Sequence, residues 1–319
     1  MIDPRPITLV VGVLLTTLGA VMLIPALVDL ALGAPGWRVF AVSSLITLFA
    51  GGAMTLATWG RAGNLSIRQA FLLTTTAWVA LALFAALPLW LGEAGLSFTD
   101  AVFESMSGIT TTGATVVIGL DSMSRGFLLW RALLQWLGGI GIIVMAVAVL
   151  PMLQVGGMQL FRLESSDTSE KILPRATQIA GSITGFYVSV TLICAAAYRI
   201  FGMDTFDAVV HAMTTIATGG YSSHDASFAF FANPAIEMVA VVFMIAGSLP
   251  FILYLQAMSG KPGLLIRDSQ VQWFLGSAAV LVAVAFVYQL VAGISAPLTA
   301  IRHAAFNVVS IMTGTGYAS

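Results

Sequence analysis

The stretch DAVFESMSGITTTG, residues 100–113, decides the fold, because two similar stretches follow later in the chain. They are DAVVHAMTTIATGG at residues 207–220 and HAAFNVVSIMTGTG at residues 303–316. Aligned on the last glycine, the three match without gaps, with alanine twelve residues before it and serine or threonine six before it. Each is a short amphipathic run that ends in a Thr/Gly loop. Such a loop, repeated between hydrophobic segments, indicates an ion filter.

The composition places the chain in a membrane. Of its 319 residues, 59% are hydrophobic and 8% are charged, and the mean hydropathy is +0.98. A water-soluble domain of this length carries more charge on its surface. Membrane lipid is therefore the expected surrounding. The net charge of −1 argues against nucleic acid as a partner, because phosphate recognition needs clustered Lys and Arg and the 13 present are scattered. No hydrolase or ATPase motif is present, and we expect neither an enzyme nor a cofactor.

Seven apolar stretches are long enough to cross a bilayer as helices. They lie at residues 7–30, 37–58, 67–91, 127–150, 176–200, 235–258 and 271–292. Three amphipathic runs, at residues 97–109, 205–216 and 297–312, are too short to span and are predicted to re-enter the membrane as half-length helices. The predicted fold class is an all-α polytopic membrane protein, built from units of helix, re-entrant pore helix with its loop, and helix.

The repeats also predict domain boundaries. We expect an N-terminal two-helix hairpin at residues 1–62, a first pore repeat at 63–150, a cytoplasmic linker at 151–173, a second repeat at 174–260 and an incomplete third repeat at 261–319. Lysine and arginine are more frequent at the span ends on the side of the amino terminus, so that side is predicted to be cytoplasmic. The three loops then enter from the outer, more acidic face.

The loops suit a cation. A dehydrating cation needs several converging oxygens, which backbone carbonyls supply, and glycine lets successive carbonyls point the same way. Each half-helix ends at its loop, so its negative dipole end faces the ion. The predicted filter residues are Thr110, Thr111, Thr112, Gly113, Ala217, Thr218, Gly219, Gly220, Thr313, Gly314, Thr315 and Gly316. The ion itself is expected at Thr111, Thr112, Thr218, Gly219, Gly314 and Thr315, where threonine hydroxyls either add ligands or brace the loop.

Glu104, His211 and Asn307 share one position, nine residues before the glycine. We expect them to brace the loops through hydrogen bonds, and direct ion ligation is the alternative, since buried intramembrane polar groups are often functional. Arg131 lies about one turn inside its span and is predicted to snorkel outward or to pair with Glu104 or Asp100.

Several of these residues are similar to those of one known family. The three loops, RALLQWLGGIGI at residues 131–142, LPML at 150–153 and GGMQL at 156–160 resemble the Trk/Ktr/HKT superfamily of potassium transporters, most closely its TrkH membrane subunits. The resemblance implies potassium as the transported ion, four repeats around one pseudo-fourfold pore, and the bacterial inner membrane as location. It also implies a homodimer and a cytosolic TrkA-like nucleotide-binding subunit as partners.

The fourth repeat of that pattern is absent from the sequence. Gly113 to Gly220 is 107 residues and Gly220 to Gly316 is 96, so a fourth loop is expected at a similar spacing beyond Ser319. We therefore expect a truncated protein or gene fragment that does not conduct by itself. Three functions stay open: potassium uptake through the Thr/Gly filter, proton- or sodium-coupled potassium symport, and a non-conducting membrane partner.

Overall fold

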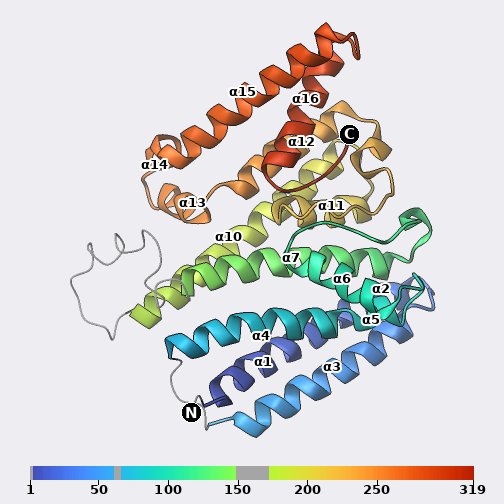
Figure 1. Ribbon diagram of the computed structural model, residues 1–319, viewed down its shortest axis with the longest axis vertical. Coiled ribbons are helices and arrows are strands. Elements are labelled where there is room, and N and C mark those ends of the chain that lie inside the picture. The colour runs from blue at the N-terminus through green and yellow to red at the C-terminus, as the bar shows by residue number, and fades with distance from the viewer. Residues whose placement is uncertain (1–2, 61–65, 149–171) are drawn as a thin grey trace. The chain divides into compact units, whose positions relative to one another are not determined.

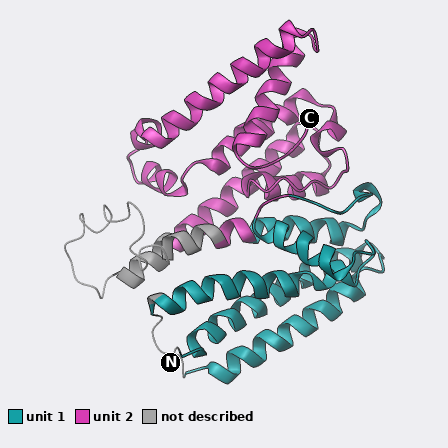
Figure 2. Cartoon of the chain, in the orientation of Figure 1, with its two compact units in different colours: residues 1–110, 114–137, 145–167 teal, residues 111–113, 138–144, 168–319 magenta. Residues whose placement is uncertain are grey.

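A computed structural model describes residues 3–60, 66–148 and 172–319, and the chain divides into two compact units (Figures 1 and 2). Unit 1 comprises residues 1–110, 114–137 and 145–167, and unit 2 comprises residues 111–113, 138–144 and 168–319. Within the described ranges every regular element is a helix. The predicted linker at 151–173 lies outside the described residues except for its last two, and the LPML and GGMQL motifs lie wholly outside them.

Unit 1 contains the predicted N-terminal hairpin and most of the first repeat. Helix α1 packs along α3 and α4, and α4 packs against α6. The helices are α1 (Arg5–Val21), α2 (Leu23–Ala31), α3 (Trp37–Thr58), α4 (Ile67–Ala85), α5 (Leu87–Trp90), α6 (Phe98–Ile109) and the first part of α7 (Arg125–Ala148).

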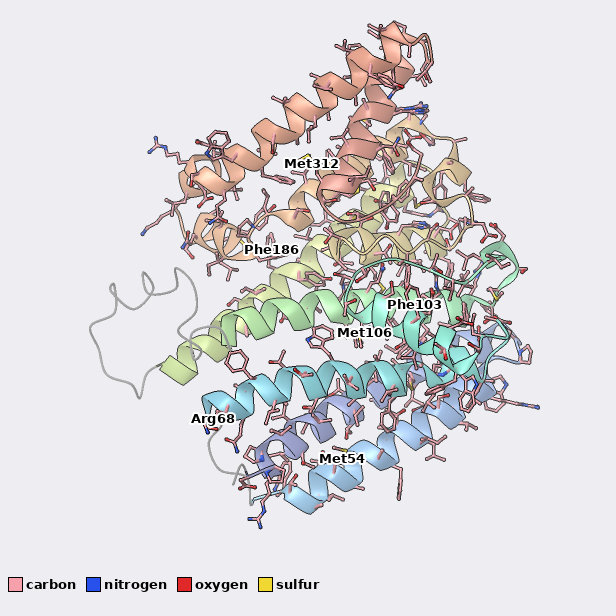
Figure 3. All side chains as sticks on the ribbon, in the orientation of Figure 1. Met54, Arg68, Phe103, Met106, Phe186 and Met312 are labelled. Carbon is pink, nitrogen blue, oxygen red and sulfur yellow. The ribbon has the colours of Figure 1, made fainter. Side chains whose placement is uncertain are left out.

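Unit 2 contains the residues of the predicted second and third repeats. Helix α10 packs against α11, α12 against α16, and α15 against α16. Phe186 of α10, labelled in Figure 3, stacks on Tyr254 of α13 with 4.8 Å between ring centroids. The helices are α10 (Ile172–Ile200), α11 (Thr205–Ile216), α12 (Pro234–Ser248), α13 (Phe251–Met258), α14 (Gly263–Arg267), α15 (Ser269–Val291) and α16 (Pro297–Met312).

The three short helices lie where the sequence predicts them, as α6, α11 and α16. They contain 12, 12 and 16 residues, fewer than a bilayer-spanning helix needs. Ser97 caps α6 by accepting a hydrogen bond from the Asp100 N–H, and Asp204 caps α11 in the same way from Phe206. Helix α16 begins instead at Pro297, because proline is favourable at the first position of a helix.

Prolines interrupt two of the predicted spans without greatly changing their direction. The stretch at 7–30 breaks at Met22, where Pro25 has no N–H for the carbonyl one turn earlier. The stretch at 67–91 breaks at Ala86 for the same reason, because Pro88 follows. By length and composition, five described stretches suit membrane spans, or six if α12 and α13 count as one.

The predicted span at residues 235–258 is not one continuous helix. Helix α12 ends at Ser248, α13 begins at Phe251, and the two axes differ by 90°. Pro250 lies in the break and disfavours helical conformation at Leu249, which is extended with φ −78° and ψ 149°. Helix α7 ends at Ala148, and the last two residues of the predicted 127–150 span lie outside the described residues.

Candidate functional site

The three predicted loops follow the three short helices and share one backbone pattern. We call the glycine on which the three loops align the register glycine. Each helix ends four residues before it, at Ile109, Ile216 and Met312. In every loop the glycine and the residue two before it have positive φ. The values are 56° at Thr111 and 78° at Gly113, 50° at Thr218 and 78° at Gly220, and 74° at Gly314 and 81° at Gly316. Positions that align in sequence therefore also have the same backbone conformation.

Left-handed backbone at Thr111 and Thr218 is costly. For an L-residue with a branched side chain this conformation costs on the order of 1–2 kcal/mol, and strain of this kind is concentrated at functional sites. The residue between the two left-handed positions is not left-handed in any of the three loops. Such alternation turns successive peptide groups the same way, which is what a row of ion-binding carbonyls requires.

The tips of the three loops meet within unit 2, which includes residues 111–113. A Cβ added to Gly113 would collide with the carbonyl oxygen of Gly219, and one added to Gly220 would collide with the carbonyl oxygen of Thr315. Each of these glycines thus faces the carbonyl that precedes the register glycine of the next loop. At Gly316 an added Cβ would meet no atom of the described residues within 4 Å. Conformation and space together require glycine at Gly113 and Gly220.

Hydrogen bonds to the helix ends hold the second and third loops. The N–H groups of Gly219 and Gly220 donate to the carbonyl of Thr214, at 2.9 and 3.5 Å. The N–H of Gly316 donates to the carbonyl of Ser310 at 3.1 Å. Thr214 and Ser310 occupy the same register position, six residues before the glycine. The N–H groups of these glycines are therefore turned toward the helices.

Threonine hydroxyls in the loops make hydrogen bonds that brace the backbone. Thr110 donates to the Met106 carbonyl at 2.7 Å, and Thr218 donates to the carbonyl of the residue before it at 2.8 Å. The hydroxyls of Thr313 and Thr315 lie 2.7 Å apart. These contacts fit the predicted bracing role of the threonines.

A serine in the short helix before the loop fixes the residue after the register glycine in the first and third loops. The Ser107 hydroxyl donates to the carbonyl of Ala114 at 2.6 Å, and the Ser310 hydroxyl donates to the carbonyl of Tyr317 at 2.7 Å. Each bond spans seven residues, so the two contacts are equivalent. The two serines, which align in sequence, thus make the same contact.

The three polar residues at the shared position each bond to the segment beyond their own loop. His211 Nε2 lies 3.0 Å from the Ser222 hydroxyl, and its Nδ1 lies 2.9 Å from the Asp207 carbonyl, to which it donates. Asn307 donates to the Ser319 hydroxyl at 3.2 Å and accepts from the Ser319 N–H at 3.4 Å. The partners are eleven or twelve residues further along the chain.

Glu104 makes the corresponding contacts in the first repeat and also forms an ion pair. Its carboxylate accepts from the Thr115 hydroxyl at 2.9 Å and from the Val116 N–H at 3.0 Å. Arg131 Nε lies 2.9 Å from the same carboxylate, and both side chains are almost completely buried. Burial of two charges is tolerable only because they are paired and hydrogen-bonded.

The predicted outward snorkelling of Arg131 and its pairing with Asp100 are both wrong. The Arg131 side chain is 1% exposed and bonds to Glu104 and to the Thr115 hydroxyl. Asp100, one helical turn before Glu104, accepts from the Ser97 hydroxyl at 2.7 Å at the start of α6. The deeper carboxylate is preferred because Arg131 is too deeply buried to reach water, and Glu104 lies at that depth.

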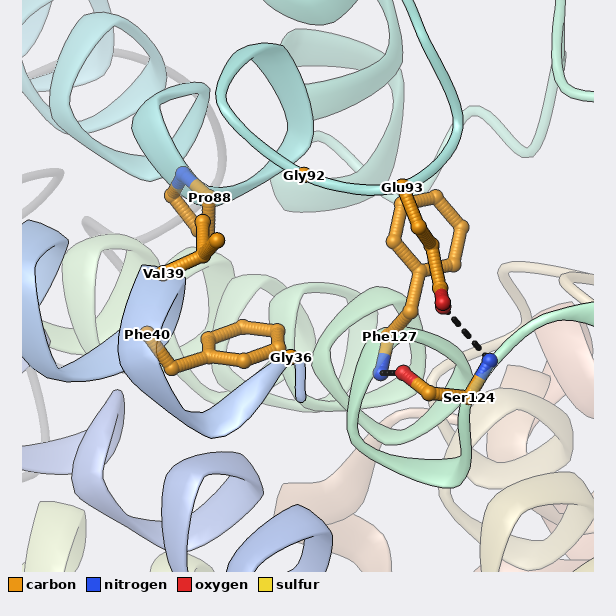
Figure 4. A pocket seen from close by; sticks show the side chains of 8 residues that line it. All are labelled: Gly36, Val39, Phe40, Pro88, Gly92, Glu93, Ser124 and Phe127. Atoms are coloured by element: carbon orange, nitrogen blue, oxygen red, sulfur yellow. Dashed lines mark hydrogen bonds between the residues drawn. The ribbon is translucent and has the colours of Figure 1, made fainter. Parts of the chain in front are cut away.

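Asp29 is a buried acid that the sequence analysis did not single out. Its carboxylate accepts from the Gly126 N–H at 2.7 Å and from the Ser124 hydroxyl at 3.1 Å, at the start of α7. Beside it is a shallow pocket, where Glu93 accepts from the Ser124 N–H (Figure 4). Asp29 thus ties the N-terminal hairpin to the first repeat. Its position inside an apolar span is the signal that could have identified it.

Comparisons with known proteins agree with this architecture. A family model described as TrkH, cation transport protein, matches residues 37–319. The chain belongs to the TrkH family of cation transport proteins. It is 45% identical to the Trk system potassium uptake protein TrkI of Halomonas elongata and 38% identical to TrkH of Escherichia coli (strain K12). The alignments cover 98% of this chain and 64% and 66% of those relatives.

A solved TrkH-family structure has the same fold. The crystal structure of the potassium transporter TrkH from Vibrio parahaemolyticus superposes with a TM-score of 0.91 at 35% identity. The superposition covers 99% of this chain and 66% of that one, so the chain spans about two thirds of the length of its relatives. The chain is thus an all-helical multi-span membrane protein of the bacterial Trk family. A cation transport family also agrees with the expectation that the chain is not an enzyme.

Proposed function

We propose that the chain forms most of a potassium uptake pathway, in which the three Thr/Gly loops line the ion path. The observation that carries this proposal is the shared left-handed backbone at matched positions of three loops whose tips meet in unit 2. A packing motif has no need of strained threonines at equivalent places. Relatives at 45% and 38% identity are named as Trk system potassium uptake proteins, and this supports potassium as the ion.

The proposed mechanism is passage of a partly dehydrated cation through rings of carbonyl oxygens. The carbonyls of Thr112, Gly219 and Thr315 occupy the same register position, immediately before the glycines, and form one such ring. The C-terminal ends of α6, α11 and α16 lead into the loops, and their negative dipole ends favour a cation over an anion. No covalent step is involved.

The finer architecture is part of the same proposal. A hairpin at residues 1–62 precedes pore repeats at 63–150, 174–260 and 261–319, with a cytoplasmic linker at 151–173. These are quarter units of a pseudo-fourfold ring. The re-entrant loops face the outer side of a bacterial inner membrane, and the partners are a second copy of the protein and a TrkA-like cytosolic subunit.

Growth of a bacterial strain without potassium uptake systems tests the proposed function. The complete gene product is expected to restore growth at limiting potassium and to carry rubidium, a potassium substitute, into the cells. Equal uptake of sodium and potassium, or no uptake by protein that reaches the membrane, would overturn it. Flux at fixed voltage with and without an imposed proton or sodium gradient separates simple conduction from coupled symport.

A further inference from the structure

Tyr317, the residue after Gly316, extends from the third loop into the second pore helix. Its side chain is 3% exposed. The phenol oxygen lies 2.5 Å from the Thr214 hydroxyl, 3.2 Å from the Thr215 hydroxyl and 3.3 Å from the His211 carbonyl. All three partners belong to α11, about 100 residues earlier in the chain. A phenol donates one proton and also accepts, so it can use several of these partners together.

The position of Tyr317 is fixed on both sides of its side chain. Its own carbonyl accepts from Ser310 of α16, so its backbone belongs to the third repeat. The next residue, Ala318, pairs with the outer segment of the second repeat: its carbonyl accepts from the Ala229 N–H at 3.2 Å, and its N–H donates to the Ser227 hydroxyl at 3.3 Å. The tyrosine therefore joins two repeats within unit 2.

The Tyr317 ring packs against an aromatic side chain, and its hydroxyl end meets polar groups. The Phe228 ring lies 4.4 Å from the Tyr317 ring, centroid to centroid. Behind the hydroxyl end, Tyr198 shares a 2.8 Å hydrogen bond with Thr215. A buried tyrosine with its hydroxyl paired is held in one orientation, because an unpaired buried hydroxyl is unfavourable.

Thr214 is the residue at which the second and third loops are joined. Its carbonyl accepts the N–H groups of Gly219 and Gly220, and its hydroxyl contacts the Tyr317 phenol. The same two loops approach most closely where Gly220 faces the Thr315 carbonyl, two residues before Tyr317. A change at the phenol is thus transmitted to the place where the loops meet.

We propose that Tyr317 is a positioning residue that sets the spacing of the second and third loops, and thereby the ion selectivity of the filter. This inference rests on the proposed function. The register equivalent in the first repeat is Ala114, whose methyl group cannot make such a contact. The first loop has instead the buried pair of Glu104 and Arg131 beside it. The first and third loops are therefore fixed by different means. The second repeat has Tyr221 at the equivalent position, and that side chain is also buried. We call the Tyr317 side chain, with its contacts to α11, the strut.

The test is Tyr317→Phe in the complete gene product, with Tyr254→Phe as the matched control. Tyr254 donates a 2.8 Å hydrogen bond to the Ala246 carbonyl at the bend between α12 and α13, so the control also loses one phenol hydrogen bond of unit 2. Tyr317→Phe is expected to retain rubidium uptake and to lower the potassium-to-sodium uptake ratio about two- to tenfold, the equivalent of one hydrogen bond. Tyr254→Phe is expected to leave the ratio unchanged.

If Tyr317→Phe does not fold, a second pair of variants tests the same contact. Thr214→Val removes the hydroxyl and keeps the shape, whereas Thr214→Ser keeps the hydroxyl, so only Thr214→Val is expected to lower the ratio. An unchanged potassium-to-sodium uptake ratio in Tyr317→Phe, or an equal decrease in Tyr254→Phe, overturns the proposed role of Tyr317. A parent protein without potassium preference overturns the proposed function instead.

Amide hydrogen exchange tests the strut without measuring transport. Faster exchange at Gly220 and Gly316 in Tyr317→Phe than in Tyr254→Phe supports it. Equal exchange rates overturn it.

Discussion

Gly220→Ala is predicted to damage the filter, whereas Gly314→Ala is predicted to be tolerated. Both glycines lie in the proposed filter loops, with φ of 78° and 74°. The difference is space: a Cβ at Gly220 would collide with the Thr315 carbonyl oxygen, and a Cβ at Gly314 would meet no described atom within 4 Å. The register equivalents of Gly314 are threonines, so a side chain is compatible with that position. Comparing the two variants separates the effect of backbone strain, which both share, from the effect of displacing the Thr315 carbonyl, which only Gly220→Ala should cause.

The expected magnitudes follow from this geometry. Left-handed alanine costs about 1–2 kcal/mol in either variant. In Gly220→Ala the collision adds about 1–3 kcal/mol, the usual cost of forcing an extra methyl into a packed site. If the Thr315 carbonyl moves to relieve it, that difference corresponds to about 5- to 150-fold in an ion-binding equilibrium.

The assay is uptake of rubidium and sodium by cells that express each variant at matched membrane levels. Gly220→Ala should lower the rubidium-to-sodium ratio by about 5-fold or more. Gly314→Ala should keep the parental ratio, with a small loss of thermal stability. Equal effects of the two variants on the ratio would refute the reasoning, because the conformational cost they share would then account for everything. A parental ratio in Gly220→Ala would refute it as well.

Two further predictions concern the buried charges of unit 1. Glu104→Gln leaves Arg131 buried without its counter-charge and should destabilise the protein by about 3–5 kcal/mol in thermal unfolding. Glu104→Gln combined with Arg131→Met should recover part of this stability. A double variant as unstable as the single one would contradict this expectation. Asp29→Ala removes the cap of α7 and should cost about 1–2 kcal/mol, whereas Asp3→Ala, which loses a solvent-exposed hydrogen bond from the Arg5 N–H, should cost less. Equal unfolding temperatures for these two alanine variants would count against the role of Asp29.

The short helices and their loops were predictable because their signals are local. Ser97 and Asp204 are cap residues directly before α6 and α11, and Pro297 begins α16. Glycine at the end of each repeat indicates the left-handed turn. The same local reasoning failed at Thr111 and Thr218, because threonine rarely adopts positive φ and nothing in its identity indicates it.

Contacts between distant parts of the chain were the other part that sequence reasoning missed. Asp29 binds Gly126, 97 residues away, and Tyr317 reaches Thr214, 103 residues away. The choice of Glu104 over Asp100 by Arg131 depends on burial depth, which two acids one helical turn apart do not reveal. The bend at Pro250 was visible as a proline, but hydropathy averages over it.

The most direct measurement of the central claim is the location of a bound ion. Thallium(I) substitutes for potassium and is located by anomalous scattering in crystals of the complete gene product. We expect an anomalous peak in contact with the main-chain oxygens of Thr112, Gly219 and Thr315. Thallium bound only elsewhere, with no peak at these three oxygens, would contradict it.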